Sequence, residues 1–163
     1  MAVKWPAESL FSEGEMMRFT VYLSGEIHTR WRADIMTGVS EAGLDVQFTS
    51  AITDHDASDA AGDHLGAEEH PFWRDHKSAK INAIRTKTLL EKADLVVIRF
   101  GDEYKQWNAA FDAGYCAALG KPYITLHAEN IVHPLKEVDA AALAWTTNTS
   151  QVVEILRYVV SQN

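Results

Sequence analysis

Cysteine is nearly missing from this 163-residue sequence, which contains Cys116 alone and therefore no internal disulfide. A chain without disulfides is typical of a reducing compartment, so we expect a cytoplasmic protein. Long hydrophobic runs are missing too. Charges are spread through the first stretch, MAVKWPAESLFSEGEMM, where we expect neither a signal peptide nor a membrane span. Residues 1–16 are predicted to form a flexible arm and residues 17–163 a single domain.

Positive charge is scarce, with 15 lysine and arginine residues against 23 acidic residues and a formal net charge of −8. This balance argues against a nucleic-acid polymer as the partner, because polymer binding depends on neutralising phosphates. Much of the deficit lies in residues 51–76, where seven acidic side chains accompany Arg74.

Residues 51–76 also hold four of the seven histidines. Imidazole and carboxylate groups can bind a divalent metal ion. The candidate ligands are His55, Asp56, Asp59, Asp63 and His64. The HExxH, CxxC and EF-hand patterns are absent, so we expect no metal and no cofactor. A polar stretch of ~26 residues is long for a connection and predicts a functional cover or an oligomer contact, with Phe72 and Trp73 anchoring it to the core or stacking on a base.

Strand and helix patterns alternate from residue 18 onward. Short runs of β-branched, aromatic and other apolar residues predict strands at 18–25, 44–50, 94–101, 122–128 and 142–147. Apolar residues at helical spacing predict helices at 29–43, 78–93, 107–120 and 149–160. This alternation predicts a single-domain, three-layer, flavodoxin-like (Rossmann-type) α/β fold with a parallel five-stranded sheet in the order 2-1-3-4-5.

Ligands of such folds bind outside the carboxyl ends of the strands, so the loops after the first three strands are the predicted site. Glu26 and His28 follow the first strand and Asp102 follows the third; each is a candidate for proton transfer or a solvent-facing side chain. Arg30 and Arg32 begin the first helix, where guanidinium groups and backbone amides suit a phosphate; the alternative is a solvated helix face.

The segment WNAAFDAGYCAALGKP, residues 107–122, holds one acidic residue, Asp112, in an otherwise apolar helix. With Asn108 as the N-cap, Asp112 lies near the positive end of the helix dipole, which predicts an ionised carboxylate. Gly114 weakens a helix interior by ~1 kcal/mol, which predicts close packing against it. The predicted buried face is Phe111, Tyr115 and Ala118. Asp112 either stabilises the helix or carries chemistry, since a held carboxylate can act as a nucleophile or stabilise an oxocarbenium ion.

Three segments together resemble the nucleoside 2-deoxyribosyltransferase superfamily and, more narrowly, the YtoQ family near it: FTVYLSGEIHTRWR, ADLVVIRFG and WNAAFDAGYCAALGKP. The resemblance covers residues 18–160 and implies that Tyr22 and Gly25 open the site at the end of the first strand. It also implies that Asp112, which precedes Gly114, takes the position of the superfamily's glutamate nucleophile.

The sequence departs from the superfamily at its acidic positions. Aspartate is one methylene shorter than the glutamate nucleophile. An aspartate expected six residues earlier is Gln106, and the aspartate that handles the proton falls at Thr86 or Arg85. The candidates to replace the missing acids are Glu26, His28 and Asp102.

The predicted activity is cleavage of the N-glycosidic bond of a nucleoside or nucleotide, by hydrolysis or base exchange. The predicted catalytic residues are Asp112, Glu26, His28 and Asp102. The predicted substrate-binding residues are Tyr22, Gly25, Arg30, Arg32, Arg85, Trp107, Asn108 and Gly114. The alternative is a non-catalytic nucleotide-binding or sensing module in which Asp112 holds ribose hydroxyls. Because superfamily sites are completed by a neighbouring subunit, the resemblance also implies a homo-oligomer, a dimer or larger.

Overall fold

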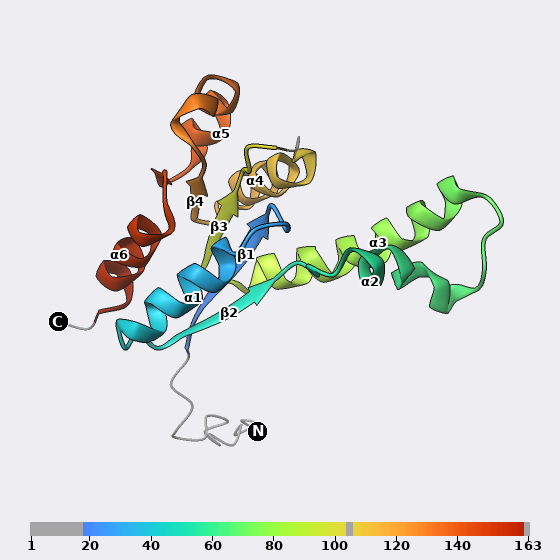
Figure 1. Ribbon diagram of the computed structural model, residues 1–163, viewed down its shortest axis with the longest axis horizontal. Helices are drawn as coiled ribbons and strands as arrows, with labels where there is room; N and C mark the ends of the chain where they lie inside the picture. Colours follow the sequence, from blue (N-terminus) through green and yellow to red (C-terminus); the bar gives the residue numbers. More distant parts are fainter. Residues whose placement is uncertain (1–17, 104–105, 162–163) are drawn as a thin grey trace, which may run out of the picture.

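The architecture is a parallel sheet with helices on both faces (Figure 1). A computed structural model describes residues 18–103 and 106–161, so the predicted arm at residues 1–16 lies outside the described residues. The five strands are parallel and follow the order β2-β1-β3-β4-β5, which confirms the predicted topology. Their bounds are Phe19–Gly25 (β1), Val46–Ser50 (β2), Leu95–Arg99 (β3), Tyr123–Leu126 (β4) and Ala144–Thr146 (β5).

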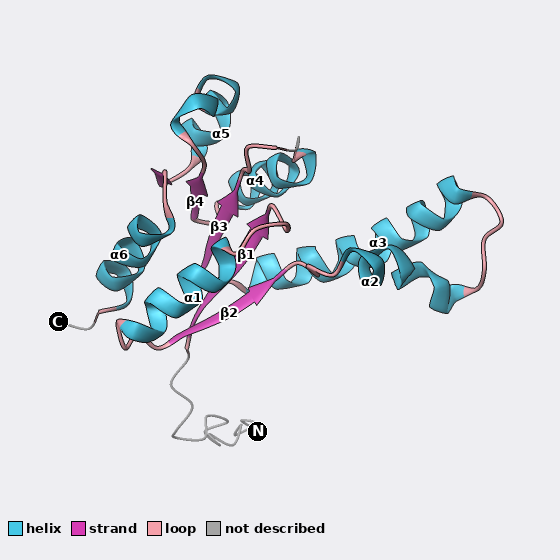
Figure 2. Ribbon diagram, viewed as in Figure 1, coloured by secondary structure: helices cyan, strands magenta, loops and turns pink. Residues whose placement is uncertain are grey.

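Helices α1 and α6 pack on one face of the sheet, and α3, α4 and α5 pack on the other (Figure 2). The bounds are Trp31–Glu41 (α1), His55–Asp59 (α2), Pro71–Lys92 (α3), Trp107–Leu119 (α4), Lys136–Ala141 (α5) and Thr149–Val160 (α6), with 3-10 turns at Ala60–Leu65 (η1), Glu129–Ile131 (η2) and His133–Leu135 (η3). Strand β1 alternates between the two cores: Val21 and Leu23 face α1 and α6, whereas Tyr22 faces α3 and α4. The sheet is therefore buried on both sides, as parallel sheets are.

Helix α6 begins and ends where the sequence predicts. The Asn148 side chain accepts a hydrogen bond from the Gln151 amide at 3.1 Å, and the Gln151 side chain accepts one from the Asn148 amide at 3.3 Å. This reciprocal capping box satisfies two backbone donors that the helix itself leaves unpaired. The apolar stripe of α6 then packs into the core through Val152 and Leu156.

Helix α4 differs from its prediction in its start and its buried face. Gln106, not Asn108, is the N-cap residue, so Asp112 lies beyond the first turn. The buried positions are Ala109, Ala113 and Cys116, while Phe111 is 77% exposed. Small side chains face the sheet because they let the helix approach it closely. The prediction of close packing at Gly114 is also wrong, since a Cβ there would have no described neighbour within 4 Å.

Residues 55–80, which we call the acidic hairpin, are helical at 55–65 and 71–80, whereas the polarity of residues 51–76 predicts a loop. The hairpin consists of α2, η1 and the first turns of α3, and it extends away from the sheet (Figure 1). Arg74 donates to both carboxylate oxygens of Asp63 at 3.0 and 2.9 Å. The Ser78 hydroxyl accepts from the Gly62 amide at 2.9 Å and donates to the Asp59 carbonyl at 2.6 Å. These local bonds hold the two sides of the hairpin together.

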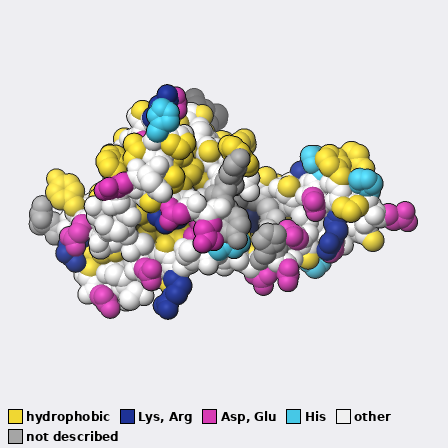
Figure 3. Space-filling model, turned by 45° about the horizontal axis from the view of Figure 1, so that its top comes forward, with side chains coloured by type: hydrophobic (Ala, Val, Ile, Leu, Met, Phe, Trp, Pro, Cys, Tyr) yellow, Lys and Arg dark blue, Asp and Glu magenta, His cyan; other side chains and the backbone are white. Residues whose placement is uncertain are grey.

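Of the two alternatives that the sequence leaves open for the aromatic side chains of the acidic hairpin, anchoring to the core is wrong, and stacking on a base stays a prediction. Phe72 and Trp73 are 55% and 56% exposed, and they contact each other and His76 instead. Figure 3 shows hydrophobic, acidic, basic and histidine side chains together on the projecting part of the molecule. Within residues 18–103 and 106–161, no group of three or more histidine, cysteine or acidic side chains is arranged to hold a metal ion. None of the helices in these ranges combines the length and apolar composition needed to cross a membrane.

The junction of β1 and β3 at Gly25 yields a stability prediction. Gly25 has a φ of +100°, and a Cβ there would lie 2.1 Å from the carbonyl oxygen of Arg99. Gly25→Ala therefore combines backbone strain with a clash, and we expect it to lower the free energy of unfolding by about 3–5 kcal/mol in urea titrations. Gly43 is a matched control, because its φ is +67° but a Cβ there meets nothing within 4 Å. Gly43→Ala should cost about 1–2 kcal/mol. Equal losses in the two variants would show that the contact with the Arg99 carbonyl adds nothing to the loss of unfolding free energy.

Candidate active site

Strand β1 and helix α4 bring a hydroxyl and a carboxyl group together at the carboxyl ends of the strands. Ser24 follows Tyr22 by two positions on β1, so its side chain points to the same face, toward α4. The Ser24 hydroxyl donates to Oδ2 of Asp112 at 2.5 Å. The half-buried Asp112 carboxyl thus lies in the region where parallel α/β folds bind ligands.

Burial controls the electrostatics of Asp112. Removal from water raises the pKa of its carboxyl above the ordinary aspartate value, and the Ser24 hydrogen bond lowers that pKa by less. This direction is opposite to the effect of the helix dipole that the sequence suggested, because burial dominates and Asp112 lies past the first turn of α4. The site therefore holds a carboxyl group that is oriented by one hydrogen bond and poorly solvated.

Two buried hydroxyls on neighbouring strands, one of them close enough to Asp112 to sense its charge, lack hydrogen bonds among the described residues. Tyr22 is 0% exposed and pairs in register with Thr49 of β2, so both side chains point toward α3. Within the described part of the chain, neither the Tyr22 hydroxyl nor the Thr49 hydroxyl has a hydrogen-bond partner. Leaving a buried hydroxyl unpaired costs about 1–3 kcal/mol. Such groups are suited to bind the polar atoms of a ligand.

The electrostatic surroundings of Tyr22 show which groups lie near its hydroxyl. Burial raises the pKa of Tyr22, Thr86 lowers it, the charge of Asp112 raises it, and the charges of Arg32 and Arg85 lower it. Thr86 is close enough to affect the hydroxyl, although the geometry does not make a hydrogen bond. Thr86 and Arg85, the two residues at which the resemblance places the proton-handling aspartate, thus both lie near Tyr22.

The loop after β3 contributes two more buried nitrogen atoms without hydrogen-bond partners in residues 18–103 and 106–161. They are Nε of Arg99 and Nε2 of Gln106. The Gln106 oxygen accepts a hydrogen bond from the Gly101 amide, and Arg99 lies 3.9 Å from Asp102. Gln106, which stands where the superfamily has an aspartate, therefore orders the loop between β3 and α4.

The loop between β1 and α1 is built around Glu26, which is 4% exposed. Its Oε1 accepts from the amides of His28 and Thr29, and its Oε2 accepts from the Thr29 hydroxyl at 2.5 Å. Burial on its own raises the pKa of Glu26, but these hydrogen bonds outweigh it and leave the pKa below the ordinary glutamate value. Glu26 is therefore a fixed anion within the loop.

Arg32 is buried and its hydrogen bonds go to the backbone. It donates to the carbonyl oxygens of Leu23, Gly25 and Glu26. Burial lowers the pKa of Arg32 to about 10, although the nearby charge of Glu26 raises it. Its guanidinium lies 4.5 Å from the centre of the Trp31 ring. The sequence predicts that Arg30 and Arg32 together bind a phosphate. In the structure Arg32 is buried and bonds to the backbone of the loop, so of these two arginines only Arg30 is exposed to a ligand.

The remaining predicted residues lie around this centre with exposed side chains. They are His28, Arg85, Asp102, Trp107 and Asn108, and Gly114 is exposed as well. Sequence reasoning missed Ser24, Thr49 and Arg99. Strand alternation could have found Ser24, because it shares the face of Tyr22, but nothing local indicates that the Thr49 hydroxyl lies opposite Tyr22.

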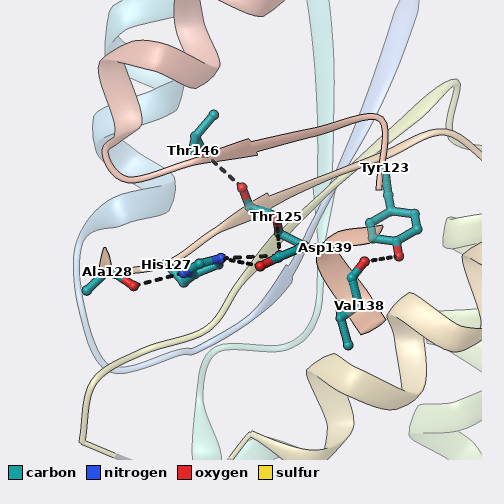
Figure 4. A network of polar contacts seen from close by, with 7 residues as sticks. All are labelled: Tyr123, Thr125, His127, Ala128, Val138, Asp139 and Thr146. Atoms are coloured by element: carbon teal, nitrogen blue, oxygen red, sulfur yellow. Dashed lines mark hydrogen bonds and ion pairs between the residues drawn. The ribbon is translucent and has the colours of Figure 1, made fainter. Parts of the chain in front are cut away.

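A second polar cluster lies along β4 and α5 (Figure 4). It differs from the unpaired groups described above, because its polar atoms bond to one another. Buried His127 places Nε2 3.0 Å from Asp139 of α5, and the Thr125 hydroxyl donates to the same carboxylate at 2.7 Å. The Tyr123 hydroxyl donates to the Val138 carbonyl at 2.6 Å. Since these groups satisfy one another, the cluster fastens α5 to β4, and it does not leave donors for a ligand.

Fold and site together define a Rossmann-type α/β domain with a carboxyl group held at the carboxyl ends of its strands. The model of the family described as Nucleoside 2-deoxyribosyltransferase YtoQ matches residues 22–160. YtoQ of Bacillus subtilis (strain 168) is 40% identical over 144 residues, which are 88% of this chain and 97% of that protein. The chain belongs to this YtoQ family, as the sequence segments predict.

Solved structures support the fold. A conserved protein from Enterococcus faecalis V583 superposes with a TM-score of 0.61 at 11% identity, covering 87% of this chain and 99% of that one. The 2-deoxyribosyltransferase from Bacillus psychrosaccharolyticus superposes with a TM-score of 0.51 at 16% identity, covering 82% of this chain and 90% of that one. At these identities the likeness is one of fold.

The unpaired hydroxyl of Tyr22 yields a prediction with a matched control. Tyr22→Phe removes a buried group that makes no hydrogen bond within residues 18–103 and 106–161, so we expect the free energy of unfolding to stay constant or to rise. Tyr123→Phe removes a hydroxyl that bonds to Val138 and should cost about 1 kcal/mol. Urea denaturation of both variants measures the difference. A larger loss in Tyr22→Phe than in Tyr123→Phe would mean that the Tyr22 hydroxyl is paired in solution.

The raised pKa of Asp112 predicts how stability depends on pH. The folded state holds this proton more tightly than the unfolded state, so the group's contribution to stability is lost as pH rises from below the ordinary aspartate pKa through the raised one. Asp112→Asn keeps an acceptor for Ser24 but cannot ionise. We therefore expect the variant to be more stable than wild type at neutral pH, with the difference shrinking in acid. Urea titrations at several pH values measure the difference, and Asp34→Asn on α1 is the control at an exposed position. An Asp112→Asn variant that is less stable than wild type at neutral pH would contradict the prediction.

Proposed function

We propose that the protein cleaves the N-glycosidic bond of nucleosides, either by hydrolysis or by transfer of the sugar to a second base. Asp112 is the proposed nucleophile or oxocarbenium stabiliser. The observation that carries this proposal is the 2.5 Å hydrogen bond by which Ser24 holds the half-buried Asp112 carboxyl at the strand ends. Membership of the YtoQ family supports the same class of chemistry.

The proposed reaction has two steps at the sugar carbon C1′. The Asp112 carboxylate bonds to C1′ while the bond from C1′ to the base nitrogen breaks, and the departing base takes up a proton. Water or a second base then attacks C1′, frees the carboxylate and gives up its own proton. A poorly solvated carboxylate suits this role, because its charge stabilises a developing oxocarbenium ion more strongly where water is excluded.

Sugar recognition is assigned to the unpaired hydroxyls of the strands β1 and β2. The hydroxyls of Tyr22 and Thr49 are buried and aligned on neighbouring strands, so they are suited to hydroxyl groups of the ligand. For proton transfer to the base, His28 is the proposed donor, since imidazole is the side chain best suited to this task near neutral pH. Glu26 is less suited, because its lowered pKa favours the ionised form.

The alternative is a non-catalytic module that binds or senses a nucleoside or nucleotide. It is favoured by the absence of an acid at two positions where the superfamily has one, at Gln106 and at Thr86 or Arg85. In that case Asp112 would accept hydrogen bonds from the sugar and would not bond to it. We also propose a homo-oligomer, because the family resemblance implies one. A neighbouring subunit would cover the side chains of Trp107 and Phe111 on α4, which are 73% and 77% exposed.

Replacement of Asp112 tests the catalytic role. If Asp112 is the nucleophile, Asp112→Asn should lower base release or base exchange by about 10³-fold or more while nucleoside binding persists, because the amide cannot bond to C1′. Chromatography of free base from ribo- and deoxyribonucleosides and their monophosphates measures the reaction. Asp112→Glu restores the superfamily's residue and should retain deoxyribosyl transfer.

The matched control for this prediction is Asp34→Asn, which removes the same charge from an exposed position of α1 and should leave turnover unchanged. Turnover that survives in Asp112→Asn would end the nucleophile proposal. A wild-type protein that binds nucleosides but releases no base would favour the binding module.

A further inference from the structure

Ser24 lies at a fixed point of the sheet. It is on β1, which lies between β2 and β3, and its backbone is in register with Ile98 of β3. Ser24 is 1% exposed, and its hydroxyl donates to Oδ2 of Asp112 at 2.5 Å. Because a strand that is paired on both sides does not shift along its neighbours, the hydroxyl fixes the place at which it meets the Asp112 carboxyl.

The hydrogen bond distinguishes the two oxygen atoms of the Asp112 carboxyl. Oδ2 is engaged by the buried hydroxyl of Ser24. Within residues 18–103 and 106–161, Oδ1 has no hydrogen bond, and Asp112 as a whole is half-buried rather than enclosed. Oδ1 is therefore the oxygen that is left for a ligand.

The other titratable groups that sense the charge of Asp112 are Tyr22 on β1 and Cys116 on α4. Burial raises the pKa of Tyr22 above its ordinary value and the pKa of Cys116 to about 12, so both groups are neutral near pH 7. The Tyr22 hydroxyl makes no hydrogen bond to Asp112. The pKa of Asp112 itself is raised by burial and lowered by Ser24, because a donated hydrogen bond favours the charged carboxylate.

We propose that Ser24 is a positioning residue for the nucleophile, whose hydroxyl holds Oδ2 of Asp112 against β1 and so presents Oδ1 to the sugar carbon C1′. The role of nucleophile rests on the proposed function, whereas the pairing of Ser24 with Asp112 does not. An aspartate is one methylene shorter than the superfamily's glutamate, so it has less reach with which to correct a misplaced carboxylate. A misplacement of ~1 Å lowers a rate by about 10²-fold, which is the reason to hold the group from a rigid strand.

Carbon-13 NMR of the Asp112 carboxyl across pH tests the pairing without any turnover. Ser24→Ala removes the hydroxyl, and we expect the pKa of Asp112 to rise above that of wild type, because the hydrogen bond no longer offsets burial. The matched control is Ser78→Ala. Ser78 is also a buried serine, 3% exposed, but its hydroxyl bonds to the backbone of Gly62 and Asp59 in the acidic hairpin. The control should leave the Asp112 titration unchanged, and an unchanged titration in Ser24→Ala overturns the proposal.

Urea titrations give a second measurement of the same pairing. A hydrogen bond to a charged group is stronger than one between neutral groups, so Ser24→Ala should lose more unfolding free energy at neutral pH than in acid, where Asp112 is protonated. In the Asp112→Asn background the loss should be the same at both pH values, because the amide does not ionise. Equal losses at the two pH values in the wild-type background count against the proposal.

Turnover measured against pH separates positioning from structural support. At neutral pH, Ser24→Ala should release base about 10- to 100-fold more slowly than wild type, with the acid side of its pH–rate profile moved to higher pH. Ser24→Thr keeps a hydroxyl and should return the profile toward that of wild type, and Ser78→Ala should keep the wild-type profile. Circular dichroism checks that each variant is folded. A Ser24→Ala variant with the wild-type rate and profile overturns the proposal. If wild type releases no base, the proposed function fails, and the Asp112 titration alone decides whether Ser24 holds the carboxyl.

Discussion

Strands β1 and β3 touch through their backbones at Gly25, and the geometry of the site depends on that contact. The Arg99 carbonyl accepts a hydrogen bond from the Glu26 amide at 3.1 Å, and it occupies the space where any side chain at position 25 would lie. The contact brings the ends of both strands and the loops after them to one place. Ser24 can then reach Asp112 of α4, and Glu26 packs against Gly101.

Two carboxyl groups in this small region meet opposite environments. Glu26 accepts three hydrogen bonds, which lower its pKa, whereas Asp112 accepts one and burial raises its pKa. Neighbouring titratable groups whose pKa values are pushed apart are typical of sites in which each group has its own task. In this division Glu26 is a fixed charge that shapes the loop between β1 and α1, and Asp112 is the proposed nucleophile.

Two sets of buried polar groups on the sheet differ in whether their hydrogen bonds are made within the protein. At the end of β4, His127, Asp139 and Thr125 bond to one another, so their burial is compensated within the fold (Figure 4). On β1 and β2, the hydroxyls of Tyr22 and Thr49 are buried without partners among the described residues. A fold retains such uncompensated groups at a cost, and a ligand that pairs with them recovers it.

The sequence by itself determined the parallel sheet, its strand order, the family and the position of Asp112, because alternating apolar patterns and short motifs are local features. It also determined α6, since Asn148 and Gln151 form a cap within one turn. Tertiary structure decided the features that depend on contacts between segments distant in the sequence. The face of α4 was fixed by how closely Ala109 and Ala113 approach the sheet. The two sides of the acidic hairpin meet through bonds between residues far apart in the sequence, such as those from Arg74 to Asp63. The pKa direction of Asp112 and the role of Glu26 depend on burial and on donors from other segments, which exist only once the chain has folded.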